Sequence, residues 1–187
     1  MAFLIPVCYN IARLILKGEV MAYYIGQILG ILVTVGAVVN LQLKNKKHMF
    51  ILSIALNLLS SLNILLVDQW NSGVIICAVA VIQLLFSLWH DKKGTKANLP
   101  EKIFFVALYV GGGLLGYNAP IDILSIVAAI LYMVAMFQKK EQNIRLFLLA
   151  NMSCWTVYHL VIGSTAIFAQ IAGIISSLIA MYIYRKK

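Results

Sequence analysis

Charge is scarce in this chain, and acidic charge most of all. Among its 187 residues, 11% are charged and only six are Asp or Glu, whereas 63% are hydrophobic. Soluble domains carry roughly a quarter of charged residues. The low charge excludes an ordinary soluble domain and predicts a membrane protein whose main partner is the lipid bilayer. Because each crossing needs about 20 residues, seven crossings leave no room for a separate catalytic domain.

Cysteines and enzyme signatures are also few. The three cysteines, Cys8, Cys77 and Cys154, lie in apolar segments, and none pairs with another at the spacing of a metal site. The sequence contains no HExxH, GxSxG, P-loop or GxGxxG motif. Asp122 is the only acidic residue that falls within an expected membrane span, so no pair of carboxylates is available there for acid–base chemistry. We therefore expect no enzyme, no cofactor and no metal.

From residue 44 onward, Lys and Arg are missing from every second gap between the hydrophobic runs. This alternation is the positive-inside pattern of a protein that crosses the membrane several times. It predicts a cytoplasmic C-terminus and an N-terminus outside. The net charge of +9 is spread over helix ends instead of clustered, so no nucleic-acid partner is expected. The residues on the predicted cytoplasmic side are 13 of the 15 Lys and Arg: Lys44, Lys46, Lys47, Lys92, Lys93, Lys96, Lys102, Lys139, Lys140, Arg145, Arg185, Lys186 and Lys187.

Seven hydrophobic runs follow a short amphipathic segment. Inside the bilayer, the backbone N–H and C=O groups of a single spanning segment can form their hydrogen bonds only within a helix. The predicted fold class is therefore an all-α membrane protein with seven transmembrane helices. Residues 1–20 predict an interfacial helix on the outer face, with partial insertion as the alternative. The expected spans are 21–43, 49–67, 73–90, 103–117, 120–137, 144–162 and 165–184.

The loops repeat along the chain. A shift of 94 residues overlays the first three spans and their loops on the last three without a gap, and it brings Asn57 onto Asn151. The pattern predicts two parallel three-helix repeats, 21–93 and 119–187, joined by a linker helix within 94–118.

Glycines gather in that linker helix. Gly112 and Gly116 form a GxxxG pair, and small residues at this spacing allow two helices to approach closely. Packing against neighbouring helices of the same chain is one interpretation. A homo-oligomer formed through the linker helix is the other.

Polar side chains inside the spans predict a binding site, because each is costly in a membrane unless it is satisfied. Asn151, Trp155 and Tyr158 share one helical face, with His159 beside it. Amides in the other spans can converge on this face to form a cavity for a small, neutral, hydrogen-bonding solute that stacks on Trp155. The candidate substrate-binding residues are Asn57, Asn63, Gln83, Asn151, Trp155, Tyr158, His159 and Gln170.

Structural roles are open for several of these positions. The Asn residues can equally hold helices together by hydrogen bonds. His159 can be an interfacial histidine, and His90 is expected in solvent at the end of its span. Asp122 suits the first turn of a helix after Pro120, where it favours the positive end of the helix dipole, and a role with a cation or proton is the alternative.

One segment carries a family resemblance. The stretch SCWTVYHLVIGST (153–165), preceded by Arg145 and followed by a seventh apolar span, resembles the YgjV family of bacterial inner membrane proteins. The resemblance implies a bacterial inner membrane location. The three-one-three layout is similar to that of the SWEET sugar transporters, the PQ-loop proteins and the KDEL receptor. This chain lacks their Pro-Gln pair, and of its three prolines only Pro120 can belong to a repeat helix.

Two functions are compatible with this layout. The first is a carrier for a small polar solute such as a sugar or nucleoside, which would bind between the two three-helix bundles. The second is a receptor or assembly protein that does not transport, which the missing prolines favour.

Overall fold

The computed structural model describes residues 20–42, 46–95, 98–137 and 141–183. Residues 1–19 of the predicted interfacial helix lie outside this range, as do Lys44, Lys96, Lys139, Lys140 and the basic C-terminus. The described residues form seven helices and no strand, which confirms the all-helical class. The helices are α2 (Val20–Gln42), α3 (Lys46–Asp68), α4 (Ser72–Lys93), α5 (Leu99–Leu115), α6 (Asp122–Phe137), α7 (Glu141–Ile162) and α8 (Ile167–Ile183).

Each predicted span corresponds to one of these helices. Four helices of the described part are long and apolar enough to cross a membrane, within Val20–Asn40, Lys47–Asp68, Ser72–Lys93 and Arg145–Ile162. Two shorter apolar helices, Asp122–Ala135 and Ile167–Ile179, accompany them. The protein is therefore a helical membrane protein with several spanning helices.

Polar residues set where the helices begin and end. The Asn71 side chain accepts a hydrogen bond from Val74 N at 3.2 Å and so caps the start of α4. Helix α4 ends at Gly94, which takes a left-handed conformation with φ of 64°. Asn98 and Glu101 form a reciprocal capping box at the start of α5, where Pro100 occupies the first turn.

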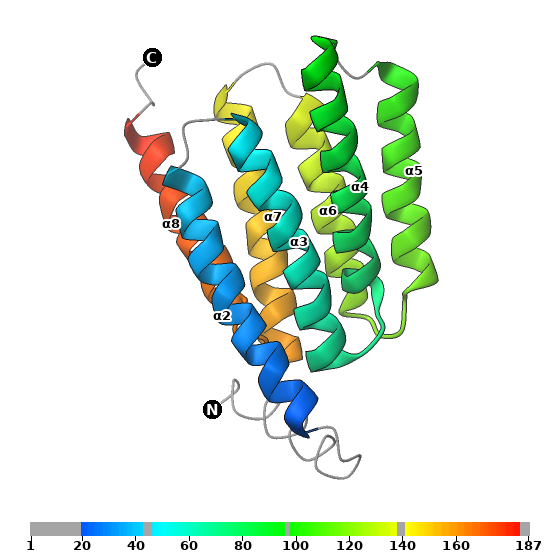
Figure 1. The fold of residues 1–187 in the computed structure, drawn as a ribbon, viewed down its shortest axis with the longest axis vertical. Coiled ribbons are helices and arrows are strands. Elements are labelled where there is room, and N and C mark those ends of the chain that lie inside the picture. Colours follow the sequence, from blue (N-terminus) through cyan, green and yellow to red (C-terminus); the bar gives the residue numbers. More distant parts are fainter. Residues whose placement is uncertain (1–19, 43–45, 96–97, 138–140, 184–187) are drawn as a thin grey trace.

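The helices run up and down in alternation, so that the chain has two distinct ends (Figure 1). One end, the basic end, contains the starts of α3, α5 and α7 and the ends of α2, α4, α6 and α8. The other, the turn end, contains the start of α2 and the short connections 69–71, 116–121 and 163–166. No Lys or Arg occurs among the described residues of the turn end. Those of the basic end include Lys47, Lys92, Lys93 and Lys102.

Six of the helices form a closed ring. Helix α2 contacts α3, α3 contacts α4, α4 contacts α6, α6 contacts α7, α7 contacts α8, and α8 returns to α2. Helix α5 lies outside the ring, against α4 and α6 (Figure 1). The ring therefore encloses an interior between its helices.

The glycines of α5 explain how closely this helix packs. A Cβ atom at Gly112 would lie 2.8 Å from Ile75, and one at Gly116 would lie 2.8 Å from the backbone of Asn71 and Ser72. The GxxxG pair therefore faces α4 of the same chain, as the first interpretation of this motif has it. A homo-oligomer through the remaining faces of α5 stays a prediction.

Two apolar clusters lie around α4. One joins α4, α5 and α6 through Ile76, Phe105, Tyr109 and Met133. The other joins α3, α4 and α7 and contains Ile64, Val74, Cys77, Tyr158 and Ile162. Large apolar side chains on the outside, such as those along α2, remain exposed and suit contact with lipid.

Candidate binding cavity

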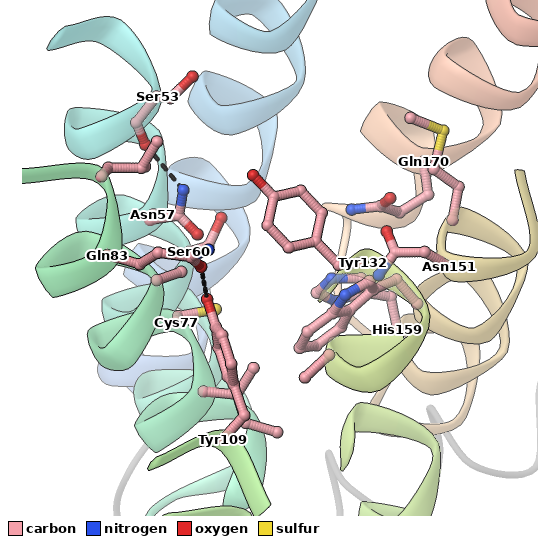
Figure 2. A pocket seen from close by; sticks show the side chains of 16 residues that line it. Ser53, Asn57, Ser60, Cys77, Gln83, Tyr109, Tyr132, Asn151, His159 and Gln170 are labelled. Carbon is pink, nitrogen blue, oxygen red and sulfur yellow. Dashed lines mark hydrogen bonds between the residues drawn. The ribbon is translucent and has the colours of Figure 1, made fainter. Parts of the chain in front are cut away.

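A cavity of about 280 Å³ lies inside the ring. Residues of α3 and α4 form one wall, with Tyr109 of α5 beside them, and residues of α6, α7 and α8 form the opposite wall (Figure 2). Most of its side chains lie near the middle of their helices or closer to the basic end. The lining residues are Ser53, Asn57, Ser60, Ile76, Cys77, Ala80, Gln83, Leu84, Tyr109, Ala129, Tyr132, Asn151, Met152, Trp155, His159 and Gln170.

The structure brings most of the predicted site residues together here. Six of the eight line the cavity: Asn57, Gln83, Asn151, Trp155, His159 and Gln170. Asn63 and Tyr158 do not. Both are fully buried and lie nearer the turn end, where they join the polar contacts that are described below. Binding of a solute by these six residues remains a prediction. Their place in one cavity is the observation that supports it.

Asn57 and Asn151 occupy opposite walls at the middle of α3 and α7 (Figure 2). The Asn57 amino group donates to the backbone carbonyl of Ser53 at 2.8 Å. The Asn151 amino group donates to the backbone carbonyl of Ala128 at 2.7 Å. Only the nitrogen of a carboxamide can donate to a carbonyl oxygen, so these bonds fix which way each amide points. Both side-chain oxygens are thus left for the cavity.

Aromatic rings form the deeper part of the α7 wall. Trp155 stacks on His159, with ring centroids 5.7 Å apart, and meets Tyr158 edge to face at 5.4 Å. His159 is 3% exposed, and its buried Nδ1 has no hydrogen-bond partner. His159 is therefore an interior side chain that contacts both Trp155 and Tyr158, and its position relative to the membrane interface stays a prediction.

Several lining residues were not predicted from the sequence. Tyr109 of α5 donates to Gln83 Oε1 at 2.5 Å, and Gln83 Nε2 contacts the sulfur of Met133 at 3.3 Å. Tyr132 enters from α6, and Ser53 and Ser60 lie on α3 above and below Asn57. Tyrosines of apolar runs carry no signal that separates a lipid-facing from an inward-facing position. Ser60 recurs with Asn57 on the polar face that the sequence predicts, so Ser53, one turn before Asn57, is the serine that this spacing could also have found.

The cavity lining contains no Asp, Glu, Lys or Arg, and His159 is the one lining residue that a proton could make positive. In the described part of the chain, no three His, Cys, Asp or Glu side chains come together in a group that could hold a metal ion. The cavity therefore offers amides, hydroxyls and aromatic faces, which suit hydrogen bonding and stacking.

Two polar clusters join the chain segments on either side of the cavity at the turn end. The first, the amide cluster, links α2 and α3 to the start of α8. Gln27 donates to the carbonyl of Gly163 at 2.6 Å and accepts from the backbone N–H of Thr165 at 2.8 Å. Asn63 donates to Gly26 O at 2.7 Å and accepts from the Ser164 hydroxyl at 2.6 Å. Asn63 thus holds helices together, as its alternative interpretation had it.

The second, the aspartate cluster, links α4 to α6. Ser72 donates to Asp122 Oδ1 at 3.0 Å and lies 2.6 Å from the Ser125 hydroxyl. Asp122 Oδ2 accepts from the backbone N–H groups of Asn118 and Ala119 at 2.8 and 3.0 Å. Tyr158 completes the group at 3.5 Å from Asp122 Oδ1. Asp122 is in the first turn of α6, so the position expected from the helix dipole is the one it has.

The fold and the cavity define a class: an all-helical membrane protein with an uncharged polar cavity inside a ring of helices. A family model described as a bacterial inner membrane protein, Imp-YgjV, matches residues 24–187, and the chain belongs to this family. The predicted resemblance is thereby confirmed, and with it a bacterial inner membrane class. No protein with a curated description and no solved structure matches the chain.

Proposed function

We propose that this protein is a carrier for a small uncharged polar solute, which binds in the cavity between two three-helix units. The observation that carries the proposal is the position of the cavity. Its walls come from α3 and α4 on one side and from α6, α7 and α8 on the other, and polar side chains face each other across it. A ligand held in this way contacts both halves of the molecule, so a movement between the halves would change its access.

The three-one-three arrangement is part of this proposal, and the ends of the helices support it. Helices α3 and α7 end at Asp68 and Ile162, 94 residues apart. The next residue in each case, Gln69 or Gly163, has a positive φ, 65° and 71°. The contacts α2–α3, α3–α4 and α2–α8 have counterparts in α6–α7, α7–α8 and α6–α4. Two parallel units related by an axis along the membrane normal would produce this correspondence.

The places where the halves are joined support a cavity that is open to one side at a time. The amide cluster connects α2 and α3 to the α7–α8 turn, and the aspartate cluster connects α4 to α6. Both clusters lie at the turn end. The cavity, in contrast, reaches Ser53 and Tyr132, which lie toward the basic end of α3 and α6. We infer that this conformation is closed at the turn end and gives access from the basic end.

The basic end faces the cytoplasm in this proposal. Its Lys and Arg residues fit the positive-inside pattern, and the described part of the turn end has none. A membrane-impermeant maleimide tests both statements on Asn57→Cys in a variant that lacks the native cysteines. Labelling from the cytoplasmic side alone is expected. Labelling from the periplasmic side alone would reverse the orientation.

Transport is tested with the purified protein in two steps. A thermal-shift screen against sugars, nucleosides, amino acids and vitamins first selects a ligand, because binding to the folded state raises the unfolding midpoint. Uptake of that ligand into proteoliposomes is then measured. Uptake should be lost in Asn151→Ala and Trp155→Ala and retained in Ser153→Ala, whose exposed hydroxyl bonds only its own helix. Unchanged uptake in the first two variants would place the site elsewhere.

A receptor or assembly protein of the same fold is the second candidate. The distribution of proline favours it: Pro100 lies in the first turn of α5 and Pro120 precedes α6, so no described helix has a proline in its interior. Helices without such a break are less easily bent. A stoichiometric partner that co-purifies with the protein, together with no flux of any ligand, would select this candidate.

A further inference from the structure

We infer that the cavity selects solutes that carry hydrogen-bond donors on two opposite edges. This inference rests on the proposed function and gives the chemistry of its ligand. It starts from the two asparagines on opposite walls, Asn57 and Asn151, whose amino groups are both engaged by backbone carbonyls.

The two amides cannot turn round without a loss. If either side chain were flipped, its oxygen would face the backbone carbonyl of Ser53 or Ala128, and two acceptors would oppose each other. Both carbonyls lie within helices and keep their backbone donors, so a flip costs the side-chain hydrogen bond itself, about 0.5–1.5 kcal/mol, and adds the repulsion between the two oxygens. Each asparagine is therefore a fixed acceptor toward the cavity.

The other polar groups of the cavity do not fix a direction in this way. The hydroxyls of Ser60 and Tyr132 can rotate to donate or to accept. Gln83 Oε1 is already used by the Tyr109 hydroxyl. Gln83 Nε2 is a donor that contacts the Met133 sulfur, and the Gln170 amide can present either of its ends. Asn57 and Asn151 are therefore the lining amides whose own bonds direct an acceptor toward the cavity. A solute that offers only lone pairs on these edges would leave acceptor against acceptor, which is a repulsive arrangement.

The charge and shape of the cavity narrow the class further. No Asp, Glu, Lys or Arg side chain lines it, so a charged solute would lose its hydration without a permanent counter-charge. Trp155 lines the same cavity and offers an aromatic face there. The class is an uncharged molecule with O–H or N–H groups on opposite edges and one face able to stack, which both monosaccharides and planar amide heterocycles satisfy.

Pairs of solutes in which methylation removes the donors test the inference, and the asparagine variants separate the loss of donors from the added size. The probes are uracil with 1,3-dimethyluracil, hydantoin with 1,3-dimethylhydantoin, and glucose with its fully O-methylated form. Each is tested at millimolar concentration by thermal shift on the full chain in detergent. We expect at least one donor-bearing member to raise the unfolding midpoint, and its methylated partner to bind about tenfold more weakly or worse, as expected for an unpaired acceptor. The three pairs also separate the sugar and heterocycle sources.

Variants assign the effect to the two asparagines. Asn57→Leu and Asn151→Leu should each abolish the preference for the donor-bearing member. Thr156→Val is the matched control, because its hydroxyl bonds the Met152 carbonyl on α7 and does not line the cavity. The preference should survive in this control. Ligand shifts are compared with the unliganded midpoint of each variant, so a general loss of stability does not imitate the result.

Three outcomes overturn the inference. These are equal or stronger binding of the methylated members, a preference that persists in both Leu variants, and no binding of any probe. Uptake into proteoliposomes keeps the inference and the proposed function apart. Uptake that favours methylated solutes would support the carrier function and contradict selection for hydrogen-bond donors. Donor-selective binding without any uptake would support selection for hydrogen-bond donors and contradict the carrier function.

Discussion

The amide cluster and the aspartate cluster do the same structural task with different chemistry. Each ties one half of the ring to the other at the turn end, and each sits where a helix of one half meets the connection into a helix of the other half. Gln27 lies 94 residues before Ile121, the neighbour of Asp122, so the two key side chains occupy almost equivalent places in the proposed repeats. One junction is neutral, however, and the other contains a carboxylate.

The difference lies in how the partners are satisfied. Gln27 both donates and accepts, so it exchanges one bond with Gly163 O and one with Thr165 N. Asp122 only accepts, and it draws in two backbone N–H groups and the Ser72 hydroxyl. Bonds to a charged group are roughly twice as strong as neutral ones. The bonds from Asn118 and Ala119 hold the start of α6, and the Ser72 bond crosses to α4. We therefore expect removal of Asp122 to cost more stability than removal of Gln27, because it affects both the start of α6 and its contact with α4.

This comparison also shows why polar groups determine which positions of neighbouring helices lie against each other. In lipid, apolar surface gains little by packing on another helix, because the lipid tails are equally apolar. Close packing and hydrogen bonds must do that work. The turn end provides both, with small residues such as Gly30 and Gly73 next to the polar clusters.

The largest expected effect comes from filling the α2–α8 junction. A Cβ atom at Gly30 would lie 2.8 Å from the backbone nitrogen of Ala166 and would also meet the Thr165 hydroxyl. Backbone cannot move aside as a side chain can, so Gly30→Val should cost about 3 kcal/mol of stability. Thermal unfolding in detergent measures the loss. Gly111→Val is the control, because a Cβ atom there meets nothing within 4 Å, and an equal loss in both variants would contradict the close approach.

Removal of the carboxylate should have the next largest effect. Asp122→Ala leaves the Ser72 hydroxyl and the N–H groups of Asn118 and Ala119 without this acceptor. Three lost interhelical or capping bonds at about 0.6 kcal/mol or more each give a loss of about 2 kcal/mol. Asp122→Asn, which keeps one acceptor oxygen, should lose less. The same thermal unfolding assay orders the three proteins, and a stability of Asp122→Ala equal to wild type would remove Asp122 from this junction.

The neutral junction should lose less than the charged one when its key side chain is removed. Gln27→Ala breaks two bonds, those with Gly163 and Thr165, for a loss of about 1 kcal/mol. Gln27→Ala and Asp122→Ala can be combined in one double-mutant cycle. Additive losses are expected, because no contact between the two clusters joins these residues. A larger loss in Gln27→Ala than in Asp122→Ala would reverse the order of the two junctions.

The sequence predicts the scaffold well because its signals are periodic. Apolar runs, basic gaps and a repeat of 94 residues do not depend on knowing which helices touch. The all-helical class and the residues that each helix contains follow from them, whereas the family resemblance rests on the segment 153–165. Four of the described helices meet the length and hydropathy of a spanning segment, and two shorter apolar ones accompany them.

The site was harder to predict, because a polar residue in a span has the same sequence signature whether it lines a cavity or joins helices. Asn57 and Asn63 illustrate this. Both lie on α3, yet Asn57 lines the cavity and Asn63 is fully buried between Gly26 and Ser164. Only the position of the α7–α8 turn decides between them. His90 was expected in solvent and is 9% exposed, because Thr95 and Glu101 of the following segment lie against it.

The smallest expected effect concerns the two turns that follow α3 and α7. Gly163 has φ of 71°, and Gln69 at the equivalent place has φ of 65°. Glycine adopts this region without a steric cost, whereas a side chain loses about 1 kcal/mol. Gly163→Ala should therefore lower stability by about 1 kcal/mol. Gln69→Gly should raise stability by only about 0.5 kcal/mol, because the greater freedom of glycine in the unfolded chain offsets part of the gain. Opposite shifts of the unfolding midpoint in the two variants would support equivalent backbone turns in the two halves. Shifts of the same sign would mean that the turns carry different local strain, which would weaken the case for the repeat.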